Sequence, residues 1–124
     1  MGDELTVVVV DDDPTTVETI VDVLGAEGFR SLAAHDGRQA IELLRAADAP
    51  RLVIIDLMMP FMSGWDLVRL LRADPTLAST AIVTSTAAEG LNPPSNTVYL
   101  AKPFGVEELL KAVALAIDRS RSTA

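Results

Sequence analysis

The chain has 124 residues, of which 49% are hydrophobic and only 4% aromatic, so it is long enough for one domain with an aliphatic core. The absence of cysteine excludes disulfides and thiolate metal sites. A formal net charge of −8 disfavours nucleic-acid binding by this chain alone. No apolar run approaches the roughly 18 residues that a membrane span needs. The start of the chain lacks a basic n-region, so we expect a cytoplasmic protein without a signal peptide.

Apolar runs that resemble strands lead into polar residues of particular kinds. The runs 5–10 and 52–55 end in aspartates, the run 81–83 enters three hydroxyl residues, and the run 98–101 precedes Lys102. Continuous β-branched runs are typical of strands buried on both faces of a parallel sheet. A weaker strand is expected at 29–34.

Segments with helical spacing of apolar residues lie between these runs. The first follows Asp13 as N-cap, with Pro14 at its first position and Gly28 at its end. The second covers 36–47. The third opens with Ser63 and Asp66 in a capping-box pattern, and the last covers about 106–118.

This alternation predicts an α/β fold with a doubly wound, five-stranded parallel sheet in the order 2-1-3-4-5. The segment 87–96 contains one glycine and two prolines, which disfavour a long helix, so the fourth helix is expected to be shortened or irregular. We assign 1–119 to this domain and 120–124 to a polar tail.

The predicted topology gathers charged side chains at one edge of the sheet. Asp11, Asp12 and Asp56 would follow adjacent strands at the switch point, where ligands bind. Carboxylates this close repel one another, and Mg²⁺ would relieve the repulsion. Lys102 could hold a phosphoryl group, and Ser85 could donate a hydrogen bond to it. Together these groups suit phosphoryl transfer.

Three stretches carry a family resemblance, in order and over nearly the whole chain: Val-Val-Val-Val-Asp-Asp-Asp-Pro (7–14), Asp-Leu-Met-Met-Pro-Phe-Met-Ser-Gly (56–64) and Leu-Ala-Lys-Pro-Phe (100–104). They resemble the receiver domain of two-component response regulators. The resemblance implies a flavodoxin-like fold and a switchable protein-interaction surface. It also implies that a sensor histidine kinase or phosphotransfer protein phosphorylates Asp56. Such a domain is not an enzyme toward other molecules.

The resemblance also implies a role for each site residue. Asp11, Asp12, Asp56 and the backbone carbonyl of Met58 would hold Mg²⁺. Lys102 would pair with Asp56 and then with its phosphoryl group. Ser85 would be the switch hydroxyl, and Tyr99 the switch aromatic. Pro103 would follow a cis peptide bond. Pro60 and Gly64 would shape the loop after the acceptor.

Several alternatives stay open. Thr84 and Thr86 compete with Ser85, although strand alternation sends them to the other face. Tyr99 could simply be packing. The stretch from Ser85 to Lys102 is about one helical turn shorter than in most receivers, which favours an interaction module independent of phosphorylation. A haloacid-dehalogenase-type phosphatase, with Asp11 as nucleophile, is a third and weaker reading.

Overall fold

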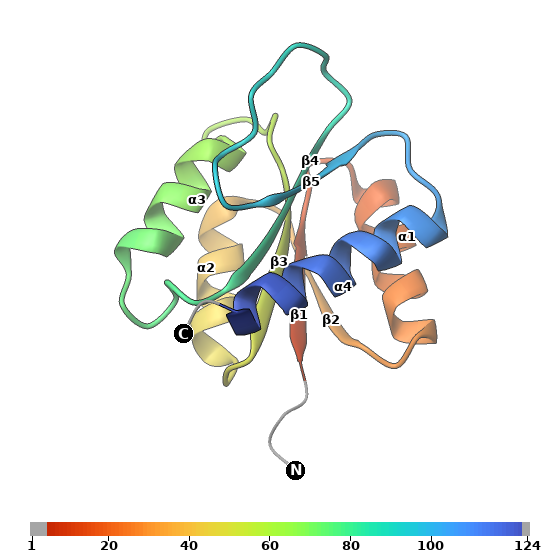
Figure 1. The fold of residues 1–124 in the computed structure, drawn as a ribbon. Coiled ribbons are helices and arrows are strands. Elements are labelled where there is room, and N and C mark those ends of the chain that lie inside the picture. Colours follow the sequence, from red (N-terminus) through yellow and green to blue (C-terminus); the bar gives the residue numbers. More distant parts are fainter. Residues whose placement is uncertain (1–4, 123–124) are drawn as a thin grey trace.

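A computed structural model describes residues 5–122, which form five strands and four helices (Figure 1). In chain order they are β1 (Thr6–Val10), α1 (Pro14–Ala26), β2 (Arg30–Ala34), α2 (Gly37–Ala46), β3 (Arg51–Asp56), α3 (Gly64–Ala73), β4 (Ala81–Thr86), β5 (Val98–Ala101) and α4 (Val106–Ser122). Among these residues no helix has the length and apolar character needed to cross a membrane.

The strands form one parallel sheet in the order β2-β1-β3-β4-β5, which confirms the predicted topology. Val10 lies opposite Ile55, and Asp56 lies opposite Ser85. The register therefore brings the carboxyl ends of β1, β3 and β4 to one edge. Helices α1 and α4 cover one face of the sheet, and α2 and α3 cover the other (Figure 1).

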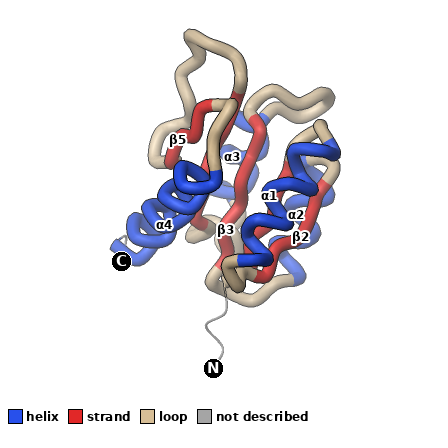
Figure 2. The backbone as a smooth tube through the Cα atoms, turned by 90° about the vertical axis from the view of Figure 1, so that its right-hand side faces the viewer, coloured by secondary structure: helices blue, strands red, loops and turns tan. Residues whose placement is uncertain are grey.

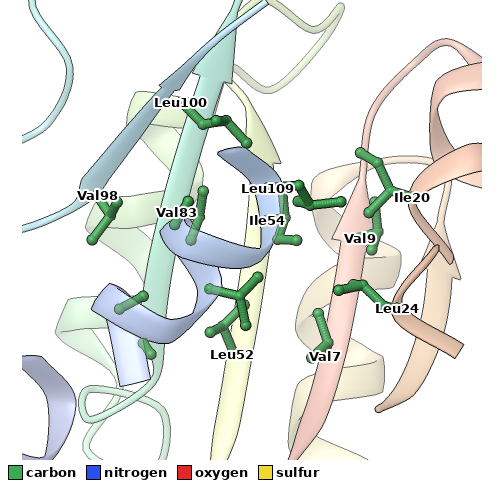
Figure 3. Close-up of a cluster of buried hydrophobic side chains, with 14 of the residues drawn as sticks. Val7, Val9, Ile20, Leu24, Leu52, Ile54, Val83, Val98, Leu100 and Leu109 are labelled. Atoms are coloured by element: carbon green, nitrogen blue, oxygen red, sulfur yellow. The ribbon is translucent and has the colours of Figure 1, made fainter. Parts of the chain in front are cut away.

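The continuous apolar runs are explained by this two-sided burial. Successive residues of a strand point to opposite faces. Val7 and Val9 enter the cluster beneath α1 and α4, whereas Val8 and Val10 enter the cluster beneath α2 and α3. Figure 3 shows the first cluster, in which Leu109 of α4 packs over the strands.

Local capping fixes where the helices begin. The carboxylate of Asp13 accepts a hydrogen bond from the backbone N–H of Thr15 at 3.0 Å, and Pro14 is the first residue of α1. Ser63 and Asp66 form the predicted capping box of α3. Asp36 is the N-cap of α2, not its first residue.

Some predicted boundaries differ from the structure by a few residues. The helix expected at 36–47 is α2 (Gly37–Ala46), and the last helix continues to Ser122 and does not end near 118. The backbone hydrogen bonds of a helix can continue through polar residues after the apolar spacing has stopped. The apolar periodicity therefore underestimates the length of the helix. The division between a domain at 1–119 and a tail at 120–124 stays a prediction, and the tail extends past the described residues.

The segment 87–97, here called the strap, connects β4 to β5, where the sequence predicts a shortened helix. None of its residues is helical, so the expected shortening is complete (Figure 2). Side chains of α3 hold it: the indole N–H of Trp65 donates to the carbonyl of Asn92 at 2.9 Å, and Arg72 donates to the carbonyl of Asn96 at 3.0 Å. The strap therefore lies along α3 instead of forming a separate helix.

Candidate functional site

Three carboxylates meet at the carboxyl edge of the sheet. Asp11 and Asp12 follow β1, and Asp56 is the last residue of β3. One oxygen from each lies within 4.8 Å of the others. Asp11 and Asp56 are only 5% and 6% exposed, whereas Asp12 faces solvent. The structure thus brings together the acids that the sequence predicts for one site.

An ammonium group from a distant part of the chain joins them. Lys102 follows β5, and its Nζ donates to Oδ2 of Asp11 at 2.6 Å and lies 3.8 Å from Oδ2 of Asp56. The sequence interpretation pairs Lys102 with Asp56, but its shorter contact here is with Asp11. The peptide bond between Lys102 and Pro103 is cis.

The environment disfavours the charged form of Asp56. Burial, and after it the neighbouring charge of Asp11, raise its pKa from 3.8 to about 6, although Lys102 and the backbone N–H of Met58 act in the opposite direction. One ammonium shared by two buried carboxylates therefore leaves negative charge uncompensated. At neutral pH Asp56 is nevertheless mostly ionised.

The donor set fits a hard divalent cation. Carboxylate oxygens are the ligands that Mg²⁺ takes from proteins, and it retains several waters. The structural observation that favours such an ion is the convergence of three carboxylates, with oxygens within 4.8 Å of one another, on the ammonium of Lys102. For Met58 the structure shows a backbone N–H that donates to Oδ1 of Asp56 at 3.2 Å.

Two hydroxyls near the end of β4 have different hydrogen bonds. Ser85 is buried and donates its only hydroxyl proton to the carbonyl of Leu100 at 2.6 Å. The hydroxyl of Thr86 accepts from the N–H of Ala88 at 3.1 Å, which leaves its own proton available. The backbone carbonyl of Thr86 also accepts from the N–H of Lys102. Thr84 is further from the edge, and its hydroxyl lies 3.2 Å from that of Thr97.

Tyr99 lies on β5 with a partly exposed side chain, and its hydroxyl is 3.5 Å from the carbonyl of Thr86. Gly64 is buried against the backbone of Leu57, and its N–H donates to the carbonyl of Leu57 at 3.0 Å. Pro60 is exposed in the loop between these residues.

Phe61 is the residue of this edge that the sequence reasoning missed. It follows Pro60, its side chain is fully exposed, and its φ is +69°. The available signal was an aromatic residue within the stretch 56–64, directly after Pro60.

Comparison with known proteins supports one family. A family model for the response regulator receiver domain matches residues 7–114. The DNA-binding response regulator MtrA of Mycolicibacterium smegmatis is 36% identical over 118 residues, covering 92% of this chain and 51% of the relative. The probable transcriptional regulatory protein TcrX of Mycobacterium tuberculosis is 34% identical over 127 residues, covering 98% and 53%. The chain thus spans about half the length of these curated relatives.

Solved structures agree with this assignment. A CheY-like receiver domain protein from Methanospirillum hungatei has a TM-score of 0.81 at 30% identity and covers 96% of this chain and 98% of its own. The Vibrio cholerae chemotaxis protein CheY4 has a TM-score of 0.81 at 27% identity, with coverages of 91% and 98%. The chain belongs to the response regulator receiver domain family of two-component systems.

Proposed function

We propose that this chain is a phosphoacceptor that takes a phosphoryl group onto Asp56 from the phosphohistidine of a sensor histidine kinase or phosphotransfer protein. One observation carries the proposal: the ammonium of Lys102 lies between the carboxylates of Asp11 and Asp56, which come from distant segments. Phosphoryl transfer depends mainly on positioning and on neutralisation of charge, and this cluster supplies both.

The transfer breaks the P–N bond of phosphohistidine and forms a P–O bond to a carboxylate oxygen of Asp56. The electron pair of the broken bond remains on the imidazole nitrogen, which then takes a proton from solvent. Lys102 can turn from Asp11 to the new phosphoryl oxygens because its side chain is already within 4 Å of both acids. Asp11, Asp12, Asp56 and the carbonyl of Met58 would hold Mg²⁺, which when bound would neutralise charge on the phosphoryl oxygens.

The added charge would switch a surface by recruiting a hydroxyl from β4. Sequence alternation favours Ser85, but the contacts favour Thr86, because the Ser85 proton is engaged by Leu100 and Thr86 is bonded to Lys102 through its backbone. Tyr99, whose hydroxyl reaches the carbonyl of Thr86, would follow this movement. The DNA-binding and transcriptional roles in the names of MtrA and TcrX belong to those longer proteins.

Intact-mass measurement after incubation with Mg²⁺ and phosphoramidate tests the proposal. We expect a single phosphate adduct on the unmodified chain and none on Asp56→Asn. Asp74→Asn is the matched control, because Asp74 is an acid paired with Arg45 outside this cluster, and it should retain the adduct. An unmodified chain that binds Mg²⁺ but never gains a phosphate would instead support the interaction module independent of phosphorylation. The family assignment leaves the phosphatase alternative without support.

Separate removal of the two hydroxyls identifies the switch residue. We expect Thr86→Val to abolish the change in Tyr99 fluorescence that beryllofluoride causes, because the hydroxyl with the available proton is lost. Ser85→Ala should retain most of that change. The opposite result would assign the switch to Ser85.

A further inference from the structure

The loop after Asp56 contains a phenylalanine, Phe61, whose exposure and backbone conformation are both unfavourable. The side chain of Phe61 has no burial, and its backbone has a φ of +69°. Residues other than glycine, asparagine and aspartate rarely adopt this left-handed conformation. The N–H of Met62 donates to the carbonyl of Pro60 at 2.8 Å, so Phe61 is the central residue of a tight three-residue turn.

Packing does not explain this residue. Its neighbours Met59 and Met62 pack against the core cluster beneath α2 and α3, and the Sδ of Met62 lies against Gly37. These contacts fix the loop without any help from the phenyl ring. Phe61 thus combines backbone strain with an aromatic side chain in water, and strain of this kind is concentrated at functional sites.

The position of Phe61 indicates what it faces. It lies five residues after Asp56, on the same loop as Met58, whose side chain is 54% exposed. Other loops of this edge expose Ala87 and Pro103. Exposed apolar residues thus lie on the loops at the edge of the sheet that carries Asp56, here called the rim. Aromatic residues and methionine are enriched in protein interfaces, where a few anchor residues supply most of the binding energy.

We propose that Phe61 is the anchor by which a phosphohistidine-bearing protein docks on this chain, an inference that rests on the proposed function. A donor protein must bring its imidazole to Asp56, which is 6% exposed, so its surface has to cover the surrounding loops. A ring that projects from that rim, held in place by its own tight turn, is inserted first. A small phosphodonor reaches Asp56 without covering the rim and therefore does not use Phe61.

Comparison of two donors on the same variants tests this inference. The small donor is phosphoramidate. The protein donor is whichever of a panel of phosphorylated histidine kinase dimerisation domains and phosphotransfer domains transfers phosphate fastest to the unmodified chain. We expect Phe61→Asn, in which asparagine tolerates the positive φ, to react with phosphoramidate within twofold of the unmodified chain. Its kcat/KM with the protein donor should fall about tenfold, mainly through KM.

Three controls keep the outcome interpretable. Phe61→Tyr retains the ring and should transfer like the unmodified chain. Leu115→Gln changes another exposed apolar side chain, which is 43% exposed on α4, and should have no effect with either donor. The thermal midpoint of Phe61→Asn should equal or exceed that of the unmodified chain, because the strain is relieved.

The two possible failures are distinct. If phosphoramidate leaves no adduct on Asp56, the proposed function is wrong. If phosphoramidate labels Asp56 but Phe61→Asn accepts phosphate from the protein donor at the unmodified rate, the docking inference is overturned. It is equally overturned if no protein donor labels a chain that phosphoramidate does label, which would leave Phe61 to a second copy or another partner.

Discussion

Replacement of Asp56 by asparagine is expected to stabilise the metal-free protein at pH 7.5. Burial and the charge of Asp11 raise the pKa of Asp56 to about 6, so its ionised form is less stable in the folded protein than in the unfolded chain. Asparagine has nearly the same shape without the charge. We expect the free energy of unfolding to rise by roughly 1–3 kcal/mol, measured by urea denaturation with a chelator present.

The gain should depend on pH with a definite sign. Between pH 3.8 and about 6 the folded state binds more protons at Asp56 than the unfolded state does, so the unmodified protein recovers stability as the pH falls. The advantage of Asp56→Asn should therefore be largest above pH 7, decline through pH 6 and disappear near pH 4. Mg²⁺ should reduce the stability difference between Asp56→Asn and the unmodified protein at neutral pH. An ion that binds only the folded unmodified protein stabilises that protein.

Asp74 offers a control of opposite sign. Its carboxylate accepts hydrogen bonds from Arg45 and from the N–H of Thr76, and these hold its pKa below 3.8. Asp74→Asn should therefore lower the free energy of unfolding at neutral pH, and the loss should fade as the pH falls below the ordinary aspartate range. An Asp56→Asn variant less stable than the unmodified chain at pH 7.5 would contradict the assignment of net repulsion at this site.

The sheet and its charged edge were predictable because they depend on patterns within single segments. The run from Val7 to Val10 has no polar residue. A strand that is buried on both faces needs such a continuous apolar run, and these valines are buried. The carboxyl ends of parallel strands lie at the same edge of the sheet. The parallel topology is therefore enough to predict that Asp11, Asp56 and Lys102 lie close together. Helix starts were equally local, since Asp13 and Ser63 each accept hydrogen bonds from residues two or three positions ahead.

Features that depend on contacts between segments were not predictable. The nearer partner of Lys102 is Asp11 and not Asp56, a difference that depends on contacts between the loop after β5 and the ends of β1 and β3. Strand alternation favours Ser85, but it does not show that Leu100 already engages its hydroxyl. Composition predicted a shortened or irregular helix between β4 and β5, yet only the structure shows that none forms there and that Trp65 binds the strap.

Phe61 was missed for a different reason. The sequence shows an aromatic residue after Pro60, but a loop phenylalanine is most often expected to pack inward. Its exposure and its left-handed φ are properties of the folded loop that no side-chain pattern encodes. Phe61 has a backbone conformation that phenylalanine disfavours and a hydrophobic side chain in water. The structure is needed to show both features at one residue.

The close approach of α3 to the acceptor strand leads to the second large effect. A Cβ atom placed on Gly64 would lie 2.7 Å from Cα of Leu57 and 2.9 Å from the carbonyl oxygen of Asp56, so it would meet backbone that cannot easily move. Gly64→Ala should therefore lower the free energy of unfolding by about 2–3 kcal/mol, the upper part of the range for overpacked sites. It should also slow phosphorylation of Asp56 by phosphoramidate, because relief of the clash displaces the backbone of Asp56, the proposed phosphoacceptor.

Gly25→Ala separates this steric effect from the general effect of replacing a glycine by alanine. Gly25 lies in α1, and a Cβ there would meet nothing within 4 Å. Since alanine favours helix over glycine, this variant should be more stable by about 0.5–1 kcal/mol. Urea denaturation of both variants checks the pair. If Gly64→Ala were as stable as the unmodified chain, α3 would have to tilt away from Leu57 at little cost, and its N-terminus would not position the acceptor loop.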